Sequence, residues 1–292
     1  MAATVTCAVI PVGGLGTRFL PVTKAVPKEM LPIVDKPLIQ YAVEEAVAAG
    51  IERIVIVTGR GKSMIEDHFD HAIELEQTLA ASQKTELLAL VEAAGMPPGA
   101  IAYTRQQEPR GLGHAVWCAR DLVGDQPFAV MLPDDMVLAE TPCLSQMLDA
   151  YATVGGNLAA VMDVPLEHTA RYGVLEVGRD DGRLAEVKGL VEKPAPEDAP
   201  STLSIIGRYV LQPEIFAKLA RQKTGAGGEI QLTDAMAGLI GQQPFHGFRF
   251  DGTRYDCGNK LGFIEATLAY ALARDDLGAA IRDMLRRLTT SL

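Results

Sequence analysis

Short apolar runs alternate with longer segments of helical periodicity in the first half of the chain. Apolar runs of about four to eight residues rich in Val and Ile indicate strands, and apolar positions three and four residues apart indicate amphipathic helices. The strands predicted in this half are 5–11, 53–58, 101–105 and 128–132. The helices predicted there are 38–49, 63–94, 113–122 and 144–151. Such alternation is typical of an α/β protein in which helices cover both faces of a parallel sheet.

The second half of the chain has a denser succession of strands, and helical patterns return near the C-terminus. The predicted strands are 158–164, 173–177, 184–192 and 204–210. The predicted helices are 213–221, 231–240, 261–273 and 277–288. The final segment is amphipathic, with Ile281, Leu285 and Leu288 three or four residues apart. It is expected to form a helical C-terminal arm that either packs on its own domain or contacts another subunit.

Composition narrows the class of protein. The 292 residues are 48% hydrophobic, which suffices for a substantial core, and the net charge of -10 argues against a nucleic-acid-binding protein. No apolar run is long enough to span a membrane, and no basic segment precedes the first apolar run, so we expect neither a membrane protein nor a signal peptide. The four scattered cysteines, at 7, 118, 143 and 257, are expected to be reduced thiols in a cytoplasmic protein.

A glycine-rich turn follows the first predicted strand. Gly13, Gly14 and Gly16 come directly after it, and Arg18 and Lys28 follow shortly afterwards. Glycine has no Cβ, so backbone N–H groups in such a turn approach phosphate oxygens closely. The Arg and the Lys are then placed to bind the same polyphosphate. The segment predicts a nucleoside triphosphate site built for nucleotidyl transfer, whereas a plain strand-to-helix turn would explain the glycines alone.

Two other phosphate-binding motifs do not fit this chain. The dinucleotide pattern Gly-x-Gly-x-x-Gly, started at Gly14, requires a third glycine where the chain has Phe19. A Walker A motif that ends at residues 61–63 requires a glycine where the chain has Ile56. A dinucleotide-dependent dehydrogenase is therefore excluded, and so is a P-loop protein.

Two aspartates are candidates to bind a metal ion. Ligands bind at the carboxyl ends of parallel strands in α/β sheets, and carboxylates there can hold Mg²⁺ against phosphate oxygens. Asp134, which follows the predicted strand 128–132, is the first candidate, and Asp256 is the second. The neighbouring Asp135 is left outside the predicted site. The alternative roles are a turn cap for Asp134 and a helix N-cap for Asp256.

Further polar residues close other predicted strands. The amide of Gln106 offers a donor and an acceptor, which suits the edge of a pyrimidine base, and Gly111 allows the backbone to approach that base. Glu192 is suited to accept hydrogen bonds from sugar hydroxyls, and Lys193 to neutralise the phosphate of a sugar phosphate. The same two residues would also fit an ordinary surface ion pair. His114 is expected to pack or to cap rather than to catalyse.

With these motifs the chain resembles the bacterial UDP-glucose pyrophosphorylases, a family of UTP–glucose-1-phosphate uridylyltransferases within the sugar-phosphate nucleotidyltransferases. The resemblance covers nearly the whole length. Its motifs are Gly14-Leu-Gly-Thr-Arg18, Pro27-Lys-Glu-Met-Leu-Pro32, Asp35-Lys-Pro-Leu-Ile-Gln-Tyr41, Gly111-Leu-Gly-His-Ala115, Leu132-Pro-Asp134, Val191-Glu-Lys-Pro194, Gly228-Glu-Ile-Gln-Leu-Thr-Asp234 and Asp256-Cys-Gly-Asn-Lys-Leu-Gly262. The last two motifs favour this family over dTDP-glucose or ADP-glucose synthases.

The resemblance implies a Rossmann-like nucleotidyltransferase fold, with a mixed, mostly parallel sheet flanked by helices in a single domain. Residues 1–155 would mainly bind the nucleotide, residues 156–260 mainly the sugar, and residues 261–292 would form the C-terminal helices. The implied reaction transfers UMP from UTP to α-D-glucose 1-phosphate, giving UDP-glucose and pyrophosphate by an in-line displacement that Mg²⁺ assists. Relatives form dimers and tetramers, so a homo-oligomer is expected, with no nucleic-acid or membrane partner.

Carried onto the matching positions, the family pattern implies a role for each site residue. Uracil and ribose would contact Gly13, Gly14, Glu29, Gln106 and Gly111. Catalysis would rest on Arg18, Lys28, Asp134 and Lys193. Mg²⁺ would be held by Asp134 and Asp256. Glucose and its phosphate would contact Gly173, Glu192 and Lys193. Gly13 stands where relatives often carry Ala, a difference expected only to loosen the loop.

Two alternatives remain beside this function. One is a related enzyme that uses dTTP or another sugar phosphate, because small details of the pocket decide that choice. The other is a catalytically silent subunit that regulates a partner enzyme. A silent subunit should lack the metal-binding Asp or a phosphate-binding Lys, and this chain has Asp134, Lys28 and Lys193.

Overall fold

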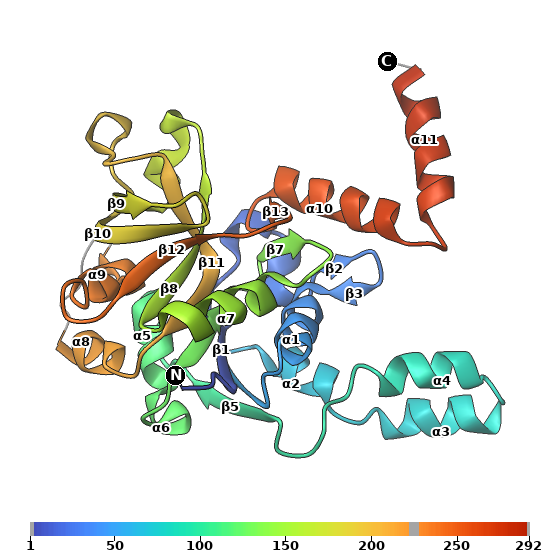
Figure 1. Ribbon diagram of the computed structural model, residues 1–292. Coiled ribbons are helices and arrows are strands. Elements are labelled where there is room, and N and C mark those ends of the chain that lie inside the picture. The colour runs from blue at the N-terminus through green and yellow to red at the C-terminus, as the bar shows by residue number, and fades with distance from the viewer. Residues whose placement is uncertain (1–2, 222–227, 291–292) are drawn as a thin grey trace.

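A nine-stranded sheet forms the centre of the computed structural model, which describes residues 3–221 and 228–290 (Figure 1). Its strands lie in the order β5-β4-β1-β6-β11-β8-β12-β10-β9. Their bounds are β1 (Cys7–Pro11), β4 (Arg53–Thr58), β5 (Ile101–Arg105), β6 (Phe128–Met131), β8 (Asn157–Asp163), β9 (Gly173–Asp180), β10 (Leu184–Glu192), β11 (Leu203–Leu211) and β12 (Phe245–Arg249). Strands from the first half of the chain make up one side of the sheet, and strands from the second half make up the other.

The two sides of the sheet differ in strand direction. β1 pairs in parallel with β4 and β6, and β4 pairs in parallel with β5. β11 is antiparallel to β6 and β8, and β10 is antiparallel to β12 and β9. The predicted mixed sheet is confirmed, but the prediction that it is mostly parallel is wrong. In its second side β8 and β12 are parallel, whereas β11 with β8, β10 with β12 and β10 with β9 are antiparallel. The short turn 181–183 joins β9 to β10, and such a turn connects only antiparallel neighbours because a parallel pair needs a longer crossover.

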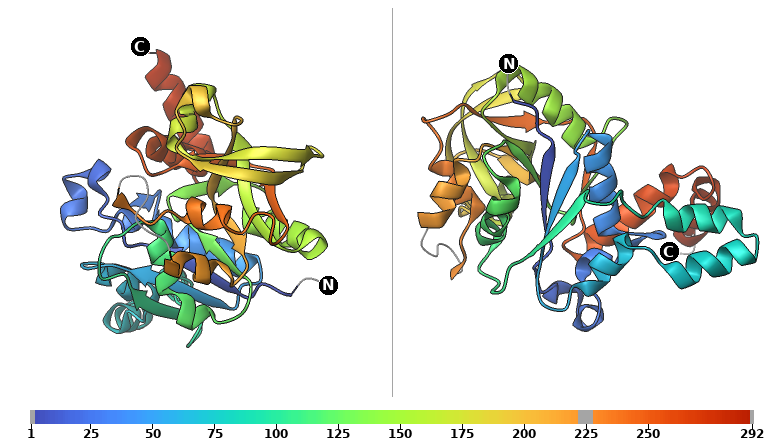
Figure 2. Two further views of the ribbon diagram at one scale, coloured as in Figure 1. Left: turned by 90° about the vertical axis from the view of Figure 1, so that its left-hand side faces the viewer. Right: turned by 90° about the horizontal axis from the view of Figure 1, so that it is seen from below.

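Helices cover both faces of the sheet, as the two views of Figure 2 show. One face packs against α1 (Leu38–Ala48), α2 (Ser63–Phe69) and α7 (Cys143–Val154). The other face packs against α5 (Leu112–Cys118), α6 (Arg120–Val123), α8 (Ile215–Arg221) and α9 (Leu232–Ala237). Alternate side chains of β1 enter the two cores, because successive residues of a strand point to opposite faces.

The predicted helix 63–94 is divided into three helices. α2 ends at Phe69, and α3 (Ile73–Ala81) and α4 (Thr85–Glu92) form a hairpin that projects from the body (Figure 1). The prediction of one helix rested on helix propensity in a segment that has almost no helix-breaking residues. The chain turns instead at Gln83, whose φ is 56°. Turning back lets α3 pack on α4 and bury Leu79.

Five strands within the described residues were not predicted. They are β12, the antiparallel pair β7 (Asp135–Leu138) and β13 (Thr253–Asp256), and the pair β2 (Pro32–Ile33) and β3 (Lys36–Pro37). These strands are short, so an alternating pattern has little length over which to stand out. In β12 the run is also interrupted by Gly247, where a Cβ would lie 2.5 Å from the side chain of Leu175.

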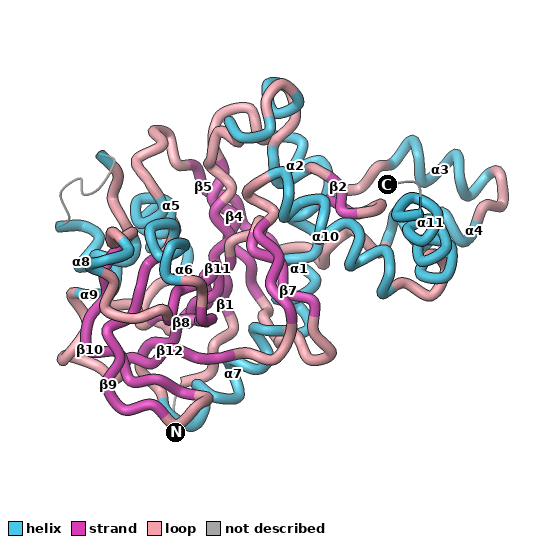
Figure 3. Tube along the Cα trace, turned by 90° about the horizontal axis from the view of Figure 1, so that it is seen from above, coloured by secondary structure: helices cyan, strands magenta, loops and turns pink. Residues whose placement is uncertain are grey.

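Two helices end the described chain, and the predicted C-terminal arm is confirmed. α10 (Lys260–Ala273) follows β13, and α11 (Gly278–Thr290) extends away from the sheet (Figures 1 and 3). The ring of Tyr270 on α10 contacts that of Tyr41 on α1 edge to face, with centroids 5.0 Å apart. Among the residues that the structure describes, none of the helices has both the length and the apolar character needed to cross a membrane.

Candidate functional site

A cavity of about 600 Å³ opens where the two sides of the sheet meet, beside the end of β6 and the middle of β11. Five residues that the sequence predicts for the site line it, namely Arg18, Gly173, Glu192, Lys193 and Asp256. These residues are far apart in the chain. The β9–β10 hairpin carries Gly173 and Glu192, the β7–β13 ribbon carries Asp256, and Arg18 lies in the turn that follows β1.

Lys28 and Asp134, which do not line this cavity, form an ion pair next to it, since Asp134 directly precedes the lining residue Asp135. Lys28 Nζ lies 2.6 Å from Asp134 Oδ2, and each side chain is about a quarter exposed, at 23% and 24%. Burial lowers the pKa of Lys28, but attraction by Asp134 and Glu29 outweighs it and leaves that pKa raised. Burial raises the pKa of Asp134, but Lys28 outweighs it and leaves that pKa lowered. Both groups therefore stay charged near neutral pH.

The glycine-rich turn brings Lys28 to this place. Gly16 has a φ of 65°, in the left-handed region that favours glycine. A Cβ there would lie 3.1 Å from both Lys28 Cβ and Thr23 Cγ2, so the turn packs tightly against the segment that carries Lys28. Gly14 faces the same lysine, since a Cβ on it would lie 3.7 Å from Lys28 Cε. The predicted grouping of the glycines with Lys28 is thus seen in space.

Two carboxylates and a guanidinium converge on Gly258. A Cβ on Gly258 would lie 2.9 Å from Asp256 Oδ1, 3.1 Å from Asp134 Oδ2 and 3.4 Å from Arg18 Nη1. Arg18 Nη1 also donates to the carbonyl oxygen of Gly258 at 3.3 Å. Asp256 accepts from the backbone N–H of Gly258 at 3.0 Å and from Arg171 at 3.1 Å. The absence of a side chain at Gly258 leaves both carboxylates open to one small volume.

The alternative role of Asp256 as a helix cap is wrong. The N-cap of α10 is Asn259, whose Oδ1 accepts from the backbone N–H of Gly262 at 2.9 Å. Asp256 is instead the last residue of β13, where it pairs with Asp135 across the β7–β13 ribbon. Its side chain is thus available to the cavity.

The donor set at Gly258 fits Mg²⁺. This ion prefers oxygen ligands and is usually held by one or two carboxylates together with substrate phosphates. Asp134 and Asp256 supply two carboxylates, and across residues 3–221 and 228–290 no group of three or more His, Cys, Asp or Glu side chains is arranged around one point. The site therefore suits a metal that arrives with its phosphates better than a metal held by protein alone.

Gln106 meets the glycine-rich turn at the end of β5. It is 6% exposed, and its Nε2 donates to the carbonyl oxygen of Gly111 at 3.0 Å and lies 3.1 Å from His114 Nδ1. Burial lowers the pKa of His114 and Arg110 lowers it further, so the ring is neutral and Nδ1 accepts from Gln106. The Oε1 of Gln106 points to Gly13, where a Cβ would lie only 2.7 Å from that oxygen.

Gly13 therefore does more than loosen the loop. A methyl group there would displace the amide of Gln106, which two hydrogen bonds hold in place. Gly111 has a φ of 98°, and a Cβ on it would lie 2.7 Å from Glu229 Cβ and 2.9 Å from the carbonyl oxygen of Ile230. The glycine thus permits close contact with the segment that leads into α9.

Glu29 is enclosed rather than open to the cavity. It is 1% exposed and lies 2.7 Å from Lys62 Nζ, which is itself buried. Burial raises the pKa of Glu29, and attraction by Lys62 and Lys28 offsets that rise only in part. Lys62 was not predicted as a site residue, because residues 61–63 do not complete a Walker A motif. The signal that could have found it is its position just beyond the carboxyl end of β4.

Gly173, Glu192 and Lys193 lie together on the hairpin of β9 and β10. A Cβ on Gly173 would lie 3.0 Å from Thr233 Oγ1 and 3.3 Å from Glu192 Oε2. Lys193 has a φ of 48°, its backbone N–H donates to the carbonyl oxygen of Tyr172, and its half-exposed ammonium lies 3.1 Å from Glu192. Thr233 was not predicted as a site residue, although it lies within the motif 228–234.

Asp135, left outside the predicted site, lines the cavity. It forms an ion pair with Arg254 and accepts from the backbone N–H of Gly207 at 2.9 Å. Burial raises the pKa of Asp135, and Arg254 offsets the rise only in part. Arg254 also donates to the hydroxyl of Tyr172 at 2.9 Å. The partners of Asp135 hold its side chain in the wall of the cavity. Neither Arg254 nor Arg171 was predicted as a site residue from the sequence.

Comparison with known proteins places the chain among nucleotidyl transferases. The family model described as "Nucleotidyl transferase" matches residues 7–272. A UTP–glucose-1-phosphate uridylyltransferase of Bacillus subtilis is 56% identical over 270 residues, which are 92% of each chain. Another, of Komagataeibacter xylinus, is 55% identical over 254 residues, which are 87% of this chain and 89% of the relative. A UTP-bound structure of the Acinetobacter baumannii enzyme superposes with a TM-score of 0.90 at 41% identity and covers 98% of this chain and 100% of that one.

Proposed function

This chain belongs to the nucleotidyl transferase family and, within it, to the UTP–glucose-1-phosphate uridylyltransferases, and we propose that its catalytic centre is the pair of Asp134 and Asp256 with the cations around them. The enzyme transfers the UMP part of UTP to glucose 1-phosphate, which produces UDP-glucose and releases pyrophosphate. The observation that carries the proposed centre is the convergence of both carboxylates and Arg18 on Gly258 at the border of the cavity.

The proposed chemistry is an in-line displacement. A phosphate oxygen of glucose 1-phosphate forms a bond to the α-phosphorus of UTP, while the bond from that phosphorus to the oxygen of the leaving pyrophosphate breaks. Both reactants are anionic, so the main task of the protein is to hold them close against their repulsion. Positioning of this kind can lower a barrier by ~7–11 kcal/mol, and no covalent enzyme intermediate is required.

The phosphates are proposed to be bound by the cations already present. Arg18 and Lys28 would bind the β- and γ-phosphates and neutralise the departing pyrophosphate. Asp134 and Asp256 would hold Mg²⁺, which supplies positive charge that stabilises the developing charge on phosphate oxygens. Lys28 pairs with Asp134 and Arg171 with Asp256, so each carboxylate has a cation that can turn to a phosphate when substrates bind.

Uracil and ribose are proposed to lie against the glycine-rich turn. Both N–H groups of the Gln106 amide are engaged by Gly111 and His114, which leaves Oε1 to accept from the N3–H of uracil. Gly13 gives the base room beside that oxygen, as does Gly14 farther along the turn. Glu29, fixed by Lys62, is proposed to lie near the ribose.

Replacing Gln106 with alanine is expected to lower the preference for UTP over CTP by roughly tenfold, because cytosine has no N3–H to donate and one hydrogen bond is worth about this much. Competing rates of pyrophosphate release from the two nucleotides measure the preference. Gln107→Ala is the matched control, since Gln107 is exposed and next in the chain. If Gln106→Ala discriminates the two bases as well as the wild type, Gln106 does not read the base.

Glucose 1-phosphate is proposed to bind between Gly173, Glu192 and Lys193. Glu192 would accept from sugar hydroxyls beside the space that Gly173 leaves open, and Lys193 would neutralise the attacking phosphate. In this division of work the residues before 156 serve mainly the nucleotide and residues 156–260 mainly the sugar. All four cysteines are free thiols, which supports a cytoplasmic location.

Removing the ammonium of Lys193 is expected to lower kcat by about 10²-fold, because it takes one charge from the reacting phosphate. The melting temperature should stay unchanged, since the half-exposed pair with Glu192 adds little stability. Steady-state kinetics and thermal melting of Lys193→Ala measure both. Lys188→Ala is the control, because Lys188 is an exposed lysine of β10, the strand that Lys193 follows. A variant that unfolds, or one with normal kcat, would assign Lys193 to structure.

A second copy of the chain is the proposed partner. The α3–α4 hairpin exposes Ile73, Leu75, Leu87 and Leu90, and its charged residues within the two helices are all glutamates. α11 exposes Leu288 and carries three arginines and one aspartate. Both elements extend from the same side of the body (Figures 1 and 3). An acidic apolar hairpin and a basic amphipathic helix are complementary, so we propose that they meet between copies.

Leu90→Asp is expected to convert an oligomer to a smaller species, because the charge would be buried in an apolar contact. Light scattering after size-exclusion chromatography at micromolar concentration measures the mass. Leu122→Asp on α6, an exposed leucine elsewhere, is the control. A wild-type monomer, or a Leu90→Asp variant of unchanged mass, would overturn the proposed contact.

The function is tested by pyrophosphate release from the purified protein with glucose 1-phosphate and Mg²⁺, offering UTP, dTTP, ATP, CTP and GTP separately. A strong preference for UTP is expected. Preference for dTTP would keep the chemistry and change the proposed base recognition. No release with any triphosphate from a folded protein would favour a regulatory subunit instead.

A further inference from the structure

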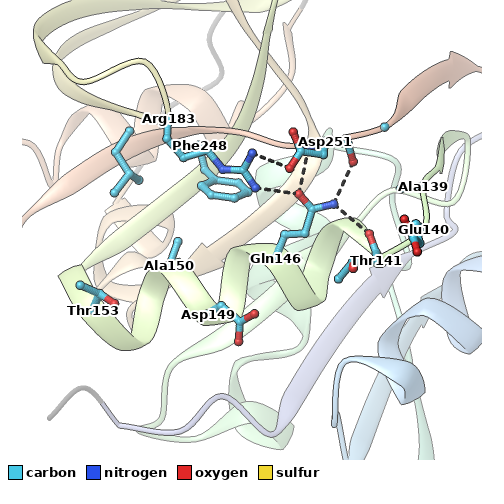
Figure 4. Close-up of a pocket in the computed structure, with 12 residues that line it drawn as sticks. Ala139, Glu140, Thr141, Gln146, Asp149, Ala150, Thr153, Arg183, Phe248 and Asp251 are labelled. Carbon is cyan, nitrogen blue, oxygen red and sulfur yellow. Dashed lines mark hydrogen bonds and ion pairs between the residues drawn. The ribbon is translucent and has the colours of Figure 1, made fainter.

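A second cavity, also of about 600 Å³, lies beside α7. Gln146 lines it, and the side-chain amide of Gln146 makes hydrogen bonds with all of its donors and acceptors (Figure 4). Gln146 Oε1 accepts from the backbone N–H of Asp251 at 2.8 Å and from Arg183 Nη2 at 3.0 Å. Its Nε2 donates to the carbonyl oxygens of Thr141 and Asp251, both at 2.8 Å. An amide offers two donors and two acceptor lone pairs, so all of its capacity is used.

The two loops that Gln146 joins lead directly into the β7–β13 ribbon. Thr141 lies just after β7, and Asp251 lies just before β13. Leu138 pairs with Thr253 at the Gln146 end of the ribbon, and Asp135 pairs with Asp256 at the other end. Strands of four residues span roughly 13 Å, so the amide acts at a distance from the proposed centre.

The inner end of this ribbon carries the proposed metal ligands. Asp256 is the last residue of β13, and the backbone N–H of Cys257 donates to the carbonyl oxygen of Asp134 at 2.7 Å. At the outer end of the ribbon, where Gln146 lies, a Cβ on Gly252 would lie 2.7 Å from Ala139 Cβ, so the two strands are in close contact there as well. A shift of one strand against the other would therefore change the separation of Asp134 and Asp256.

We propose that Gln146 is a positioning residue that sets the spacing of Asp134 and Asp256 by fixing the outer ends of the strands that carry them. It touches no substrate. This inference rests on the proposed metal site, and it assigns to Gln146 the role that groups outside the ligand shell have in metal centres. Removing a group that hydrogen-bonds a metal ligand directly weakens metal binding by about 10–100-fold, and Gln146, which acts through the ribbon, is expected at the lower end of that range.

The test is a titration of the wild type and variants with Mn²⁺ in the presence of UTP and without sugar phosphate, followed by the paramagnetic signal of free Mn²⁺. Gln146→Met keeps the length of the side chain and removes all four hydrogen bonds. Gln146→Glu keeps the bonds from Asp251 and Arg183 and sets a carboxylate oxygen against the two carbonyl oxygens in place of a donor. Gln212→Met is the matched control, since Gln212 holds the other end of α7 by donating to Tyr151 and Gly156.

Gln146→Met and Gln146→Glu are each expected to raise the dissociation constant of Mn²⁺ about tenfold, because neither side chain donates to both carbonyl oxygens. Gln212→Met is expected to lower the melting temperature without changing Mn²⁺ binding. An unchanged dissociation constant in whichever Gln146 variant folds would overturn the inference and leave the metal site standing. Equal Mn²⁺ binding by the wild type and Asp134→Asn would overturn the metal site and the inference with it.

Discussion

Asp134→Ala is expected to lower kcat by about 10³-fold or more, because it removes a proposed metal ligand and several kcal/mol of charge stabilisation. It also removes the ion-pair partner of Lys28, whose ammonium lies 2.6 Å from the carboxylate. The loss should persist in saturating Mg²⁺, since added metal cannot replace the missing oxygen. Steady-state pyrophosphate release across a range of Mg²⁺ concentrations measures it.

The control for this variant is Asp121→Ala, which removes an exposed carboxylate on α6 outside the site. Asp134→Asn adds a second comparison, because it keeps the shape of the side chain and removes its charge. Folding is followed by circular dichroism and by the melting temperature. Near-normal turnover of folded Asp134→Ala in saturating Mg²⁺ would show that Asp134 is not a ligand of the catalytic metal.

Gly258→Ala is expected to lower kcat by about 10²-fold while the fold stays intact, because the added methyl group takes volume needed by the metal and removes its charge stabilisation. The new Cβ would lie 2.9 Å from Asp256 Oδ1 and 3.1 Å from Asp134 Oδ2. The φ of Gly258 lies outside the left-handed region, so alanine fits the backbone. Metal affinity should fall together with kcat.

The measurement for Gly258→Ala is kcat and the Mg²⁺ concentration that gives half of it. Gly95→Ala is the matched control, since Gly95 is exposed, has an ordinary φ and lies outside the site. If Gly258→Ala needs no more Mg²⁺ than the wild type and turns over normally, the carboxylates do not share a metal at this point.

The parts of the fold that sequence predicts well are those with a strong local pattern. β4, β5 and β10 match the predicted bounds because each is an apolar or alternating run bounded by polar or turn residues. The break at Gln83 was missed because helix propensity does not reveal where a hairpin of two helices turns. β12 was missed because its place in the sheet depends on neighbours such as Leu175 rather than on its own sequence.

The candidate site shows the same contrast between residues that a local pattern marks and residues that depend on distant partners. Arg18, Lys28 and Asp134 were predicted as site residues because motifs and strand ends mark them in the sequence. Lys62 and Arg254 were missed because they act through partners distant in the chain, Glu29 and Asp135. Ion pairs of this kind form only when the chain folds, so one sequence carries little signal for them.

Asp134 and Asp256 are proposed to share one metal ion at Gly258. A crystal structure of the protein with UTP and Mn²⁺, with anomalous difference maps, tests this proposal most directly. The expected result is one strong peak within coordination distance of both carboxylates and of a UTP phosphate oxygen, with Lys28 moved from Asp134 to a phosphate. A peak away from both carboxylates, or Lys28 still paired with Asp134 beside bound UTP, would show that the two carboxylates do not share a metal in this way.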